Sequence, residues 1–364
     1  MHDADRDPEQ VRLRAALDAL PAYVPGRAAP PRHGVTAYKA SSNENPYPPL
    51  ESVRAVIERA AGSVNRYPDM AVSELTAAIA GSLDVDAVNI ATGTGSVGVL
   101  GQVITATCDP GDEVVYAWRS FEAYPIVVAL AGAQSVQVGL DQDARHRLDA
   151  MLAAISDRTQ VVIICTPNNP TGTCVHQEEF DLFLRRVPEH VLVLIDEAYV
   201  EFVTDPQVAD AMRAFRSHPN VAVLRTFSKA YGLAGLRVGY AVAHPRLTAA
   251  LRRTAVPFGV SSIAQAAAIA SLDAFEQLKE RVDALVAERH RVAAALEEQG
   301  WKLPASEANF VWFPLGERST AFTQACQDAG LAVRQYGNDG VRVTVSEPEA
   351  NAVLLEVAAA FGPC

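Results

Sequence analysis

The chain has 364 residues, of which 49% are hydrophobic and 20% are charged, and its formal net charge at pH 7 is -12. This length exceeds one minimal domain and predicts a large domain together with a smaller one. The negative charge argues against general nucleic-acid binding and against adhesion to anionic membranes, although it leaves room for a local basic pocket that binds anionic substrates.

The cysteines and the first residues indicate the compartment. The five cysteines are Cys108, Cys165, Cys174, Cys326 and Cys364. An odd, scattered set without metal-ligand spacing is typical of free thiols in a reducing compartment. The first ten residues carry four acidic side chains against one arginine, the opposite of a secretory leader. No apolar run approaches the length of a membrane span, and we expect a cytoplasmic protein without a metal.

The predicted elements begin after an irregular segment. Residues 20–49 are rich in proline and suit an arm that lies over the body of the protein. From about residue 50 to residue 244, short apolar runs alternate with helical patterns. The predicted strands are Asp112–Trp118, Ser135–Leu140, Val161–Thr166, Val191–Ile195, Val221–Thr226 and Val238–Ala243. Several are continuous Val, Ile and Leu, which predicts an α/β fold whose largely parallel sheet is covered on both faces.

The C-terminal third has a different pattern. A long helical region runs roughly from Ser262 to Gln299, and a mixed β/α tail follows with strands near Asn309–Phe313 and Val341–Val345. The boundary between the two predicted domains therefore lies in the helical region.

A lysine stands just past the end of one predicted strand. Lys229 has hydroxyls before it, glycines after it and Arg237 eight residues on. Burial at a strand end lowers the pKa of an ammonium group and makes the amine a Schiff-base former, while hydroxyls and a guanidinium bind phosphate. An amine beside a phosphate cradle predicts pyridoxal phosphate. Taken alone, Lys229 also fits a solvated surface lysine, and Arg237 fits a surface ion pair.

Polar residues also follow two neighbouring strands. Pro-Asn-Asn-Pro-Thr-Gly, which contains Asn169, follows Val161–Thr166, and Asp196 and Tyr199 follow Val191–Ile195. Taken alone, the Pro-Asn-Asn-Pro-Thr-Gly segment also fits a turn framed by prolines, and Asp196 also fits a helix N-cap. In open parallel sheets, however, ligands gather at the carboxyl ends of strands. Together these residues suit a protonated pyridine ring, because a carboxylate keeps the ring nitrogen protonated and able to accept electrons.

The sequence resembles the fold-type-I aminotransferases, specifically the histidinol-phosphate and aromatic aminotransferase subfamily. The matching motifs are Ser-Ser-Asn-Glu-Asn-Pro, Asn-Arg-Tyr-Pro-Asp, Pro-Asn-Asn-Pro-Thr-Gly, Asp-Glu-Ala-Tyr, Ser-Lys-Ala-Tyr-Gly-Leu-Ala-Gly-Leu-Arg and Ala-Asn-Phe-Val. The resemblance covers nearly the whole chain from about Leu20. It implies a seven-stranded, mostly parallel sheet between helices and a smaller α/β C-terminal domain. The expected division is an N-terminal arm and substrate-side segment (1–49), a large cofactor-binding domain (50–260) and a small domain (261–364).

The resemblance also implies a role for each matched residue. Lys229 would hold pyridoxal phosphate covalently, Asp196 would pair with the pyridine nitrogen, and Asn169 and Tyr199 would reach the ring oxygen. The phosphate would be bound by Gly95, Ser96, Val97, Thr226, Ser228 and Arg237, with Tyr67 from the other subunit of a homodimer. Phe121 would stack on the ring, where many relatives have tyrosine.

The substrate end of the site has two arginines near the C-terminus. By resemblance, Arg342 would grip the substrate carboxylate with its planar fork, and Arg334 would lie close by. Relatives that act on histidinol phosphate use the equivalent arginines to bind its phosphate. Taken alone, each arginine could equally be an ordinary surface residue. Asn45, Tyr23, Tyr47 and Phe258 are candidates for the side-chain pocket, with ordinary packing as the alternative. Short stretches such as Trp118–Glu122 look more like the actinobacterial aromatic (phenylalanine) aminotransferases, which favours an aromatic amino acid as donor and a 2-oxo acid such as 2-oxoglutarate as acceptor.

Two other functions fit parts of the sequence. Residues 93–98, Gly-Thr-Gly-Ser-Val-Gly, fit the dinucleotide pattern G-x-G-x-x-G, and Arg119 at the end of the next strand could suit a 2′-phosphate. The same peptide N–H groups suit the phosphate of pyridoxal phosphate, and a dehydrogenase would leave Lys229, Asp196 and Asn169 without a common purpose. A non-catalytic sensor that kept the fold is the second alternative. We expect no DNA-binding module before the chain, and the presence of the full set of site residues disfavours a sensor.

Overall fold

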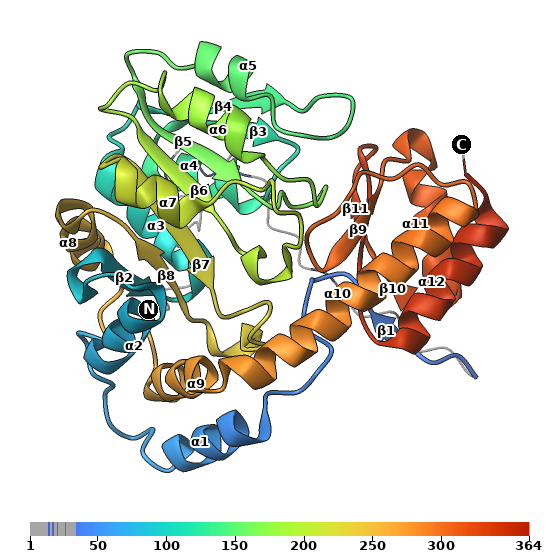
Figure 1. The fold of residues 1–364 in the computed structure, drawn as a ribbon, viewed down its shortest axis with the longest axis horizontal. Helices are drawn as coiled ribbons and strands as arrows, with labels where there is room; N and C mark the ends of the chain where they lie inside the picture. Colours follow the sequence, from blue (N-terminus) through green and yellow to red (C-terminus); the bar gives the residue numbers. More distant parts are fainter. Residues whose placement is uncertain (1–13, 15–16, 18–19, 21–25, 27–33, 364) are drawn as a thin grey trace, which may run out of the picture.

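A seven-stranded sheet forms the centre of the larger unit (Figure 1). The computed structural model describes residues 34–363 together with Arg14, Leu17, Leu20 and Gly26. The strands of this sheet, in spatial order, are β2 (Ile90–Gly93), β8 (Gly239–Val242), β7 (Val221–Thr226), β6 (Leu192–Asp196), β5 (Thr159–Cys165), β3 (Glu113–Trp118) and β4 (Gln134–Gly139). Only the pairs that β8 makes with β2 and β7 are antiparallel. The prediction of a mostly parallel, seven-stranded α/β sheet is confirmed.

Both faces of the sheet are buried, which explains the continuous apolar runs. On β3, Val115 and Ala117 point into one hydrophobic core, while Val114 and Tyr116 point into the other. Because successive side chains of a strand alternate between its faces, a strand covered on both sides is apolar at every position. Each such side chain contributes roughly 1.5–3 kcal/mol when it is fully buried.

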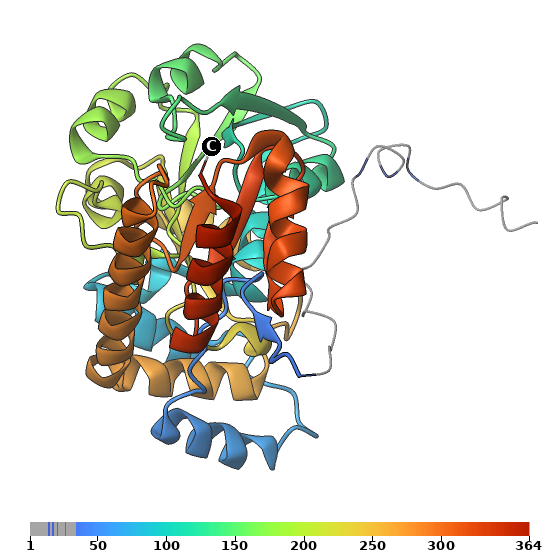
Figure 2. The same cartoon turned by 90° about the vertical axis from the view of Figure 1, so that its right-hand side faces the viewer.

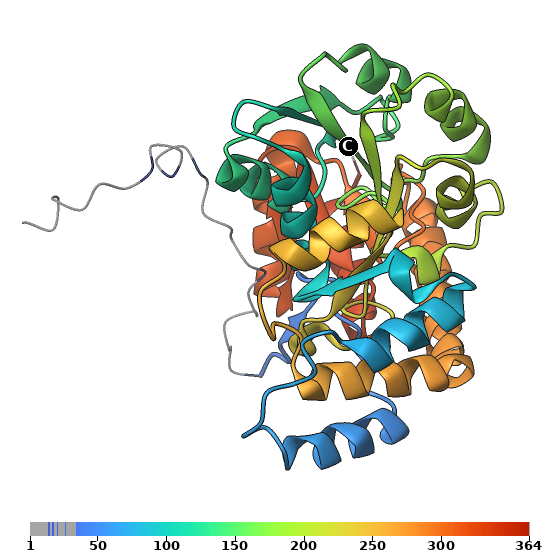
Figure 3. The same cartoon turned by 90° about the vertical axis from the view of Figure 1, so that its left-hand side faces the viewer.

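Helices cover the two faces of the sheet. One core includes side chains of α3 (Gly95–Thr107), α4 (Ala123–Ala131) and α8 (Pro245–Thr254). The other includes α2 (Ser73–Leu83), α5 (Leu148–Ala153), α6 (Gln177–Leu184), α7 (Ala211–Ser217) and α9 (Ser262–Asp273). Helix α9 also packs against α1 (Glu51–Ala61), as Figure 3 shows from the side of the larger unit. No helix in the described part of the chain is long and apolar enough to cross a membrane.

The C-terminal residues form a second, smaller unit (Figure 2). Its antiparallel sheet has the order β11 (Arg334–Tyr336), β12 (Gly340–Thr344) and β9 (Phe310–Phe313), and α11 (Ser319–Asp328) and α12 (Pro348–Phe361) pack beside it. A short strand before α1, β1 (Tyr38–Lys39), pairs in parallel with β10 (Leu331–Ala332). This pairing holds the start of the described chain on the C-terminal unit, so residues 41–45 pass between the two units on their way to α1.

One helix connects the two units. The predicted helical region consists of α9 and α10 (Phe275–Glu298), which are separated at Ala274. The first half of α10 buries Leu278 and Val282 in a core of the larger unit, and its second half buries Val292 and Leu296 in the core of the smaller one. We propose that the boundary between the units lies within α10.

Candidate active site

A cleft of about 240 Å³ lies where the carboxyl ends of β5, β6 and β7 face the C-terminal unit. It brings together most of the residues that the sequence predicted for the site. Those lining it are Ser96, Val97, Phe121, Asn169, Asp196, Tyr199, Thr226, Ser228, Lys229, Arg237, Arg334 and Arg342. Because β5, β6 and β7 run in parallel, residues that follow them in sequence meet at one edge of the sheet.

Lys229 is on the turn that follows β7. Its Nζ donates a hydrogen bond to the carbonyl oxygen of Ser42 at 3.1 Å and lies 5.8 Å from the centre of the Tyr199 ring. Burial, helped by the positive charge of Arg342 and opposed by the negative charge of Glu44, lowers the pKa of this amine to about 7. A large fraction of Lys229 is therefore neutral, and nucleophilic, near pH 7.

Asp196 ends β6 at the floor of the cleft. Its Oδ2 accepts a hydrogen bond of 2.7 Å from the Tyr124 hydroxyl, whereas its Oδ1 is buried without a hydrogen-bond partner. Burial raises the pKa of Asp196 to about 6, although the bond from Tyr124 lowers it. An unpaired buried acceptor costs roughly 1–3 kcal/mol. A protonated ring nitrogen in the cleft would supply the missing donor.

The opposite end of the cleft is built to hold an anion. Helix α3 begins at Gly95 without a side-chain cap, so its first N–H groups are available and carry the positive end of the helix dipole. Gly95 has φ 78°, and a Cβ there would lie 2.4 Å from Nη2 of Arg237. Arg237 donates to Ser228 Oγ at 3.4 Å, and Thr226 Oγ1 donates to the same atom at 3.0 Å. A guanidinium, two hydroxyls and a helix N-terminus together fit a phosphate.

Two neutral polar groups line the middle of the cleft. The Tyr199 hydroxyl accepts a hydrogen bond of 2.9 Å from Asn43 Nδ2, and burial raises the pKa of this phenol above its usual range. The Asn169 Oδ1 accepts a bond from Arg342. Tyr199 therefore stays a neutral phenol that can donate to an oxygen in the cleft.

The two arginines of the C-terminal unit lie opposite each other on β11 and β12. Arg342 is buried and donates to the Tyr336 hydroxyl and to the Ser41 carbonyl oxygen, both at 2.8 Å, while its Nε has no hydrogen-bond partner. Arg334 donates to the Glu122 carboxylate at 2.5 Å. An arginine with a free donor beside the Lys229 amine is suited to bind a carboxylate.

Four residues that the sequence reasoning missed complete this geometry: Asn43, Glu122, Tyr124 and Tyr336. Glu122 and Tyr124 closely follow the predicted ring-stacking residue Phe121, and Asn43 lies within the Ser-Ser-Asn-Glu-Asn-Pro motif, so both motifs carried a usable signal. Nothing in the sequence around Tyr336 distinguishes it.

Three of the predicted site residues do not line the cleft. Gly95 lies behind the Arg237 guanidinium. The Asn45 side chain donates to the Ala230 carbonyl oxygen at 2.9 Å and so braces the turn next to Lys229. Tyr67 is 82% exposed and its ring centre lies 4.6 Å from that of Phe258.

The candidates for an aromatic side-chain pocket do not gather in the cleft either. Tyr47 and Phe258 are absent from its lining and are 38% and 40% exposed. Tyr23 lies outside the described residues.

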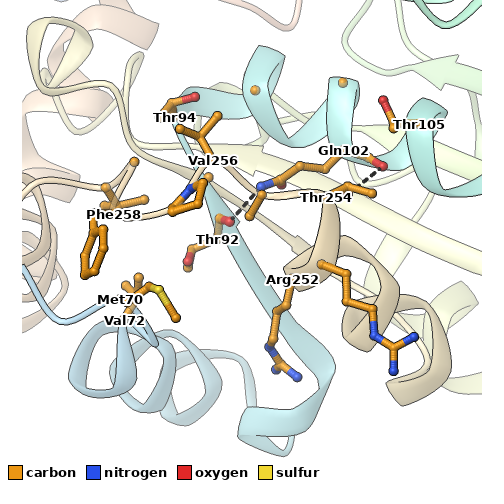
Figure 4. Close-up of a pocket in the computed structure, with 18 of the residues that line it drawn as sticks. Met70, Val72, Thr92, Thr94, Gln102, Thr105, Arg252, Thr254, Val256 and Phe258 are labelled. Atoms are coloured by element: carbon orange, nitrogen blue, oxygen red, sulfur yellow. Dashed lines mark hydrogen bonds between the residues drawn. The ribbon is translucent and has the colours of Figure 1, made fainter.

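A larger cavity of about 830 Å³ lies elsewhere on the larger unit. Figure 4 shows Phe258 and Val256, on the loop after α8, gathered with Met70 and Val72 at one side of it. On its wall, Gln102 of α3 donates to the Thr92 carbonyl oxygen at 3.4 Å. Among the described residues, the smaller cleft is the better candidate for the site of chemistry, because a lysine with a lowered pKa and an unpaired carboxylate oxygen meet there.

The topology excludes the dinucleotide-binding interpretation of residues 93–98. A dinucleotide fold needs the glycine-rich turn to join two adjacent parallel strands. Here β2 lies at the edge of the sheet, and β8, β7, β6 and β5 separate it from β3, the next strand in sequence. The turn instead starts α3 beside Arg237.

Comparison with known proteins agrees with this geometry. Residues 38–357 match the family model described as aminotransferase class I and II. The chain belongs to this family. It is 58% identical over 350 residues to an aromatic amino acid aminotransferase of Streptomyces coelicolor, covering 96% of this chain and 97% of that protein. The corresponding protein of Thermobifida fusca is 54% identical over 349 residues, with the same coverage.

A solved structure has the same fold. The histidinol-phosphate aminotransferase of Sinorhizobium meliloti, in complex with pyridoxal 5′-phosphate, superimposes with a TM-score of 0.86 at 30% identity, covering 96% of this chain and 98% of that one. The predicted fold-type-I aminotransferase architecture is thus confirmed, and the protein is an enzyme of the transaminase class. Its family and this complex imply dependence on pyridoxal phosphate, which the unpaired Asp196 oxygen and the α3 cradle fit.

The bond between Tyr124 and Asp196 generates a testable prediction. Tyr124→Phe removes the donor that lowers the pKa of Asp196, so this pKa should rise from about 6 by roughly one unit, equivalent to about 1.4 kcal/mol. Infrared difference spectra of the carboxyl band across a pH titration of the cofactor-free protein would measure the shift, with Asp196→Asn identifying the band. An unchanged titration in Tyr124→Phe would show that this hydrogen bond does not control the carboxyl.

Proposed function

We propose that this aminotransferase uses pyridoxal phosphate to exchange the amino group of an aromatic amino acid with a 2-oxo acid such as 2-oxoglutarate. One observation carries the proposal: a lysine with a pKa of about 7 shares one cleft with an unpaired buried carboxylate oxygen. The names of the relatives at 54–58% identity support the aromatic substrate. Histidinol phosphate is the alternative donor, supported by the name of the structural neighbour at 30% identity.

In our proposal, each part of the cofactor has its own set of residues in the cleft. Lys229 would hold it covalently, and Asp196 would accept a hydrogen bond from the ring nitrogen. The phosphate would lie against Ser96 and Val97 at the start of α3, together with Thr226, Ser228 and Arg237, with Gly95 giving the guanidinium room. Phe121 would stack on the ring, and Asn169 and Tyr199 would bind the ring oxygen. When bound, pyridoxal phosphate supplies an aldehyde that reacts with amines and a ring that accepts electrons.

The protein groups then divide the remaining work. With the cofactor bound and the Lys229 amine free, its Nζ would accept the proton that the substrate Cα loses, and would donate that proton back to a Cα when a 2-oxo acid is converted to its amino acid. Asp196 would accept a hydrogen bond from the ring nitrogen and so favour its protonated form. Arg342 binds the substrate carboxylate and so fixes the Cα within reach of Lys229. A 2-oxo acid presents the same carboxylate and reverses the sequence.

The pKa of Lys229 predicts how cofactor attachment depends on pH. Only the neutral amine attacks an aldehyde, so the rate of attachment to the cofactor-free protein should rise with pH through a midpoint near 7, well below the 10.5 of an ordinary lysine. Stopped-flow absorbance after mixing with pyridoxal phosphate would measure this rate. Lys229→Ala serves as the control and should give no adduct that borohydride fixes to the chain. A borohydride-fixed adduct at another lysine would refute the assignment.

The substrate is tested by a donor competition. The holoenzyme is offered phenylalanine, tyrosine and histidinol phosphate with 2-oxoglutarate as acceptor, and kcat/KM is measured for each. We expect the aromatic amino acids to exceed histidinol phosphate by at least about tenfold, the factor that a difference of 1.4 kcal/mol in transition-state binding produces. A preference for histidinol phosphate would establish the alternative function.

We further propose that the enzyme is a homodimer in which Tyr67 binds the cofactor phosphate of the other subunit. Met70, Val256 and Phe258 are exposed apolar residues that line the large cavity of Figure 4. The exposed ring of Tyr67 packs against Phe258 and extends this apolar cluster. A patch of this kind is typical of an association surface. Tyr67 cannot serve its own site as the structure stands, because it does not line the cleft around Lys229.

Subunit mixing tests this shared site. Tyr67→Ala and Lys229→Ala should each have low activity, the first through weakened cofactor binding. Refolded together, they should form hybrid dimers in which one of the two sites has both native residues, and activity should return to a sizeable fraction of the native level. Mixed samples no more active than the two variants measured separately would show that Tyr67 does not act across an interface.

A further inference from the structure

A carboxylate lies beside the proposed substrate-binding arginines of the cleft, where the proposed reaction has no need of one. Glu122 stands between Phe121 and the first residue of α4, and both it and Arg334 line the cleft. Arg334 Nη2 lies 2.5 Å from Glu122 Oε2. The side chains are 11% exposed for Arg334 and 27% for Glu122, so the pair is partly shielded from water and the carboxylate is its more accessible member.

The two arginines that the C-terminal unit contributes to the cleft have different partners. Arg342 donates to neutral oxygens, those of Asn169, Tyr336 and Ser41. Arg334, directly opposite it on the neighbouring strand, faces a carboxylate instead. Arg342 therefore presents its full positive charge to a substrate, whereas most of the charge of Arg334 is balanced by Glu122.

We propose that Glu122 is a specificity-determining residue that disfavours ligands bearing a second anionic group. This inference rests on the proposed aminotransferase function. A substrate with one carboxylate and an uncharged aromatic side chain binds Arg342 and leaves the ion pair of Glu122 and Arg334 intact. A dicarboxylate, or an amine with a phosphate, must either displace Glu122 from Arg334 or stay next to its negative charge. Both alternatives weaken binding, because removing one partner of a shielded charge pair is costly.

The same reasoning applies to a dicarboxylic acceptor. With 2-oxoglutarate, one carboxylate occupies Arg342 and the other has to compete with Glu122 for Arg334. The greater exposure of Glu122 allows its carboxylate to turn towards water during this exchange. Glu122 thus lowers the affinity of the site for acidic ligands relative to aromatic ones, but it does not exclude acidic ligands.

The test removes the charge and keeps the shape of the side chain. Glutarate and 3-phenylpropionate are non-reacting analogues with two carboxylates and with one carboxylate and a ring. Their dissociation constants are measured by absorbance titration of the holoenzyme. In Glu122→Gln we expect glutarate to bind about tenfold more tightly and 3-phenylpropionate to change less than twofold. The ratio of kcat/KM for histidinol phosphate to that for phenylalanine should rise by a similar factor, whereas Glu122→Asp should keep the native values.

A second arginine–carboxylate pair provides the matched control. Asp339 accepts a hydrogen bond of 2.7 Å from Arg119 Nε, and neither residue lines the cleft. Asp339→Asn should leave both dissociation constants unchanged. An unchanged glutarate constant in Glu122→Gln, or an equal shift in Asp339→Asn, would overturn the proposal, the latter because it would reveal a general effect of net charge.

Folding does not limit this experiment. The Glu122 side chain caps no N–H group of α4, so Glu122→Ser loses no cap and repeats the test if Glu122→Gln fails to fold. The analogue measurements are also independent of the proposed substrate. A native enzyme that does not transaminate aromatic amino acids would refute the proposed function, while the shift in glutarate affinity alone decides the role of Glu122.

Discussion

The site depends on one constraint: the amine of Lys229 and the carboxylate of Asp196 are both buried away from water in the same cleft. Burial lowers the pKa of Lys229 to about 7 and raises that of Asp196 to about 6. The pKa values of a lysine and an aspartate in water lie much further apart, and at neutral pH both side chains would be almost fully charged. The cost of leaving Asp196 Oδ1 without a donor is the physical reason that the cleft favours a protonated heterocycle.

The large sheet and the C-terminal unit make this desolvation possible together. Three parallel strands deliver Asn169, Asp196 and Lys229 to one edge, but that edge would be open to water without the smaller unit. Residues 41–45 close the gap: Asn43 binds Tyr199 on one side and Thr344 on the other, and Ser42 accepts the bond from Lys229. Helix α10, which has its ends in different cores, joins the two units behind them.

The charges in the cleft separate two tasks that a single enzyme of this type has to perform. In our proposal, Arg342 binds the carboxylate that every amino acid and 2-oxo acid shares, through a guanidinium held by neutral oxygens. We propose that the pair of Arg334 and Glu122 contacts the side group that distinguishes one substrate from another. In our proposal the charge of Arg342 is always available to a carboxylate, whereas the charge of Arg334 is balanced by Glu122 until an anionic group of the ligand competes for it.

The amino-acid sequence by itself determined the α/β sheet and the strand-end residues, because apolar runs report burial on both faces and parallel strands place their carboxyl ends together. Lys229, Asp196 and Asn169 follow from that rule, and resemblance supplied their roles. Only the tertiary structure decided that Tyr124 holds Asp196, that Asn43 holds Tyr199, that Glu122 faces Arg334, and that Asn45 and Tyr67 lie outside the cleft. Such pairs join residues far apart in the chain. Whether they meet depends on the directions of their side chains and on how the two units pack, and a local sequence pattern predicts neither.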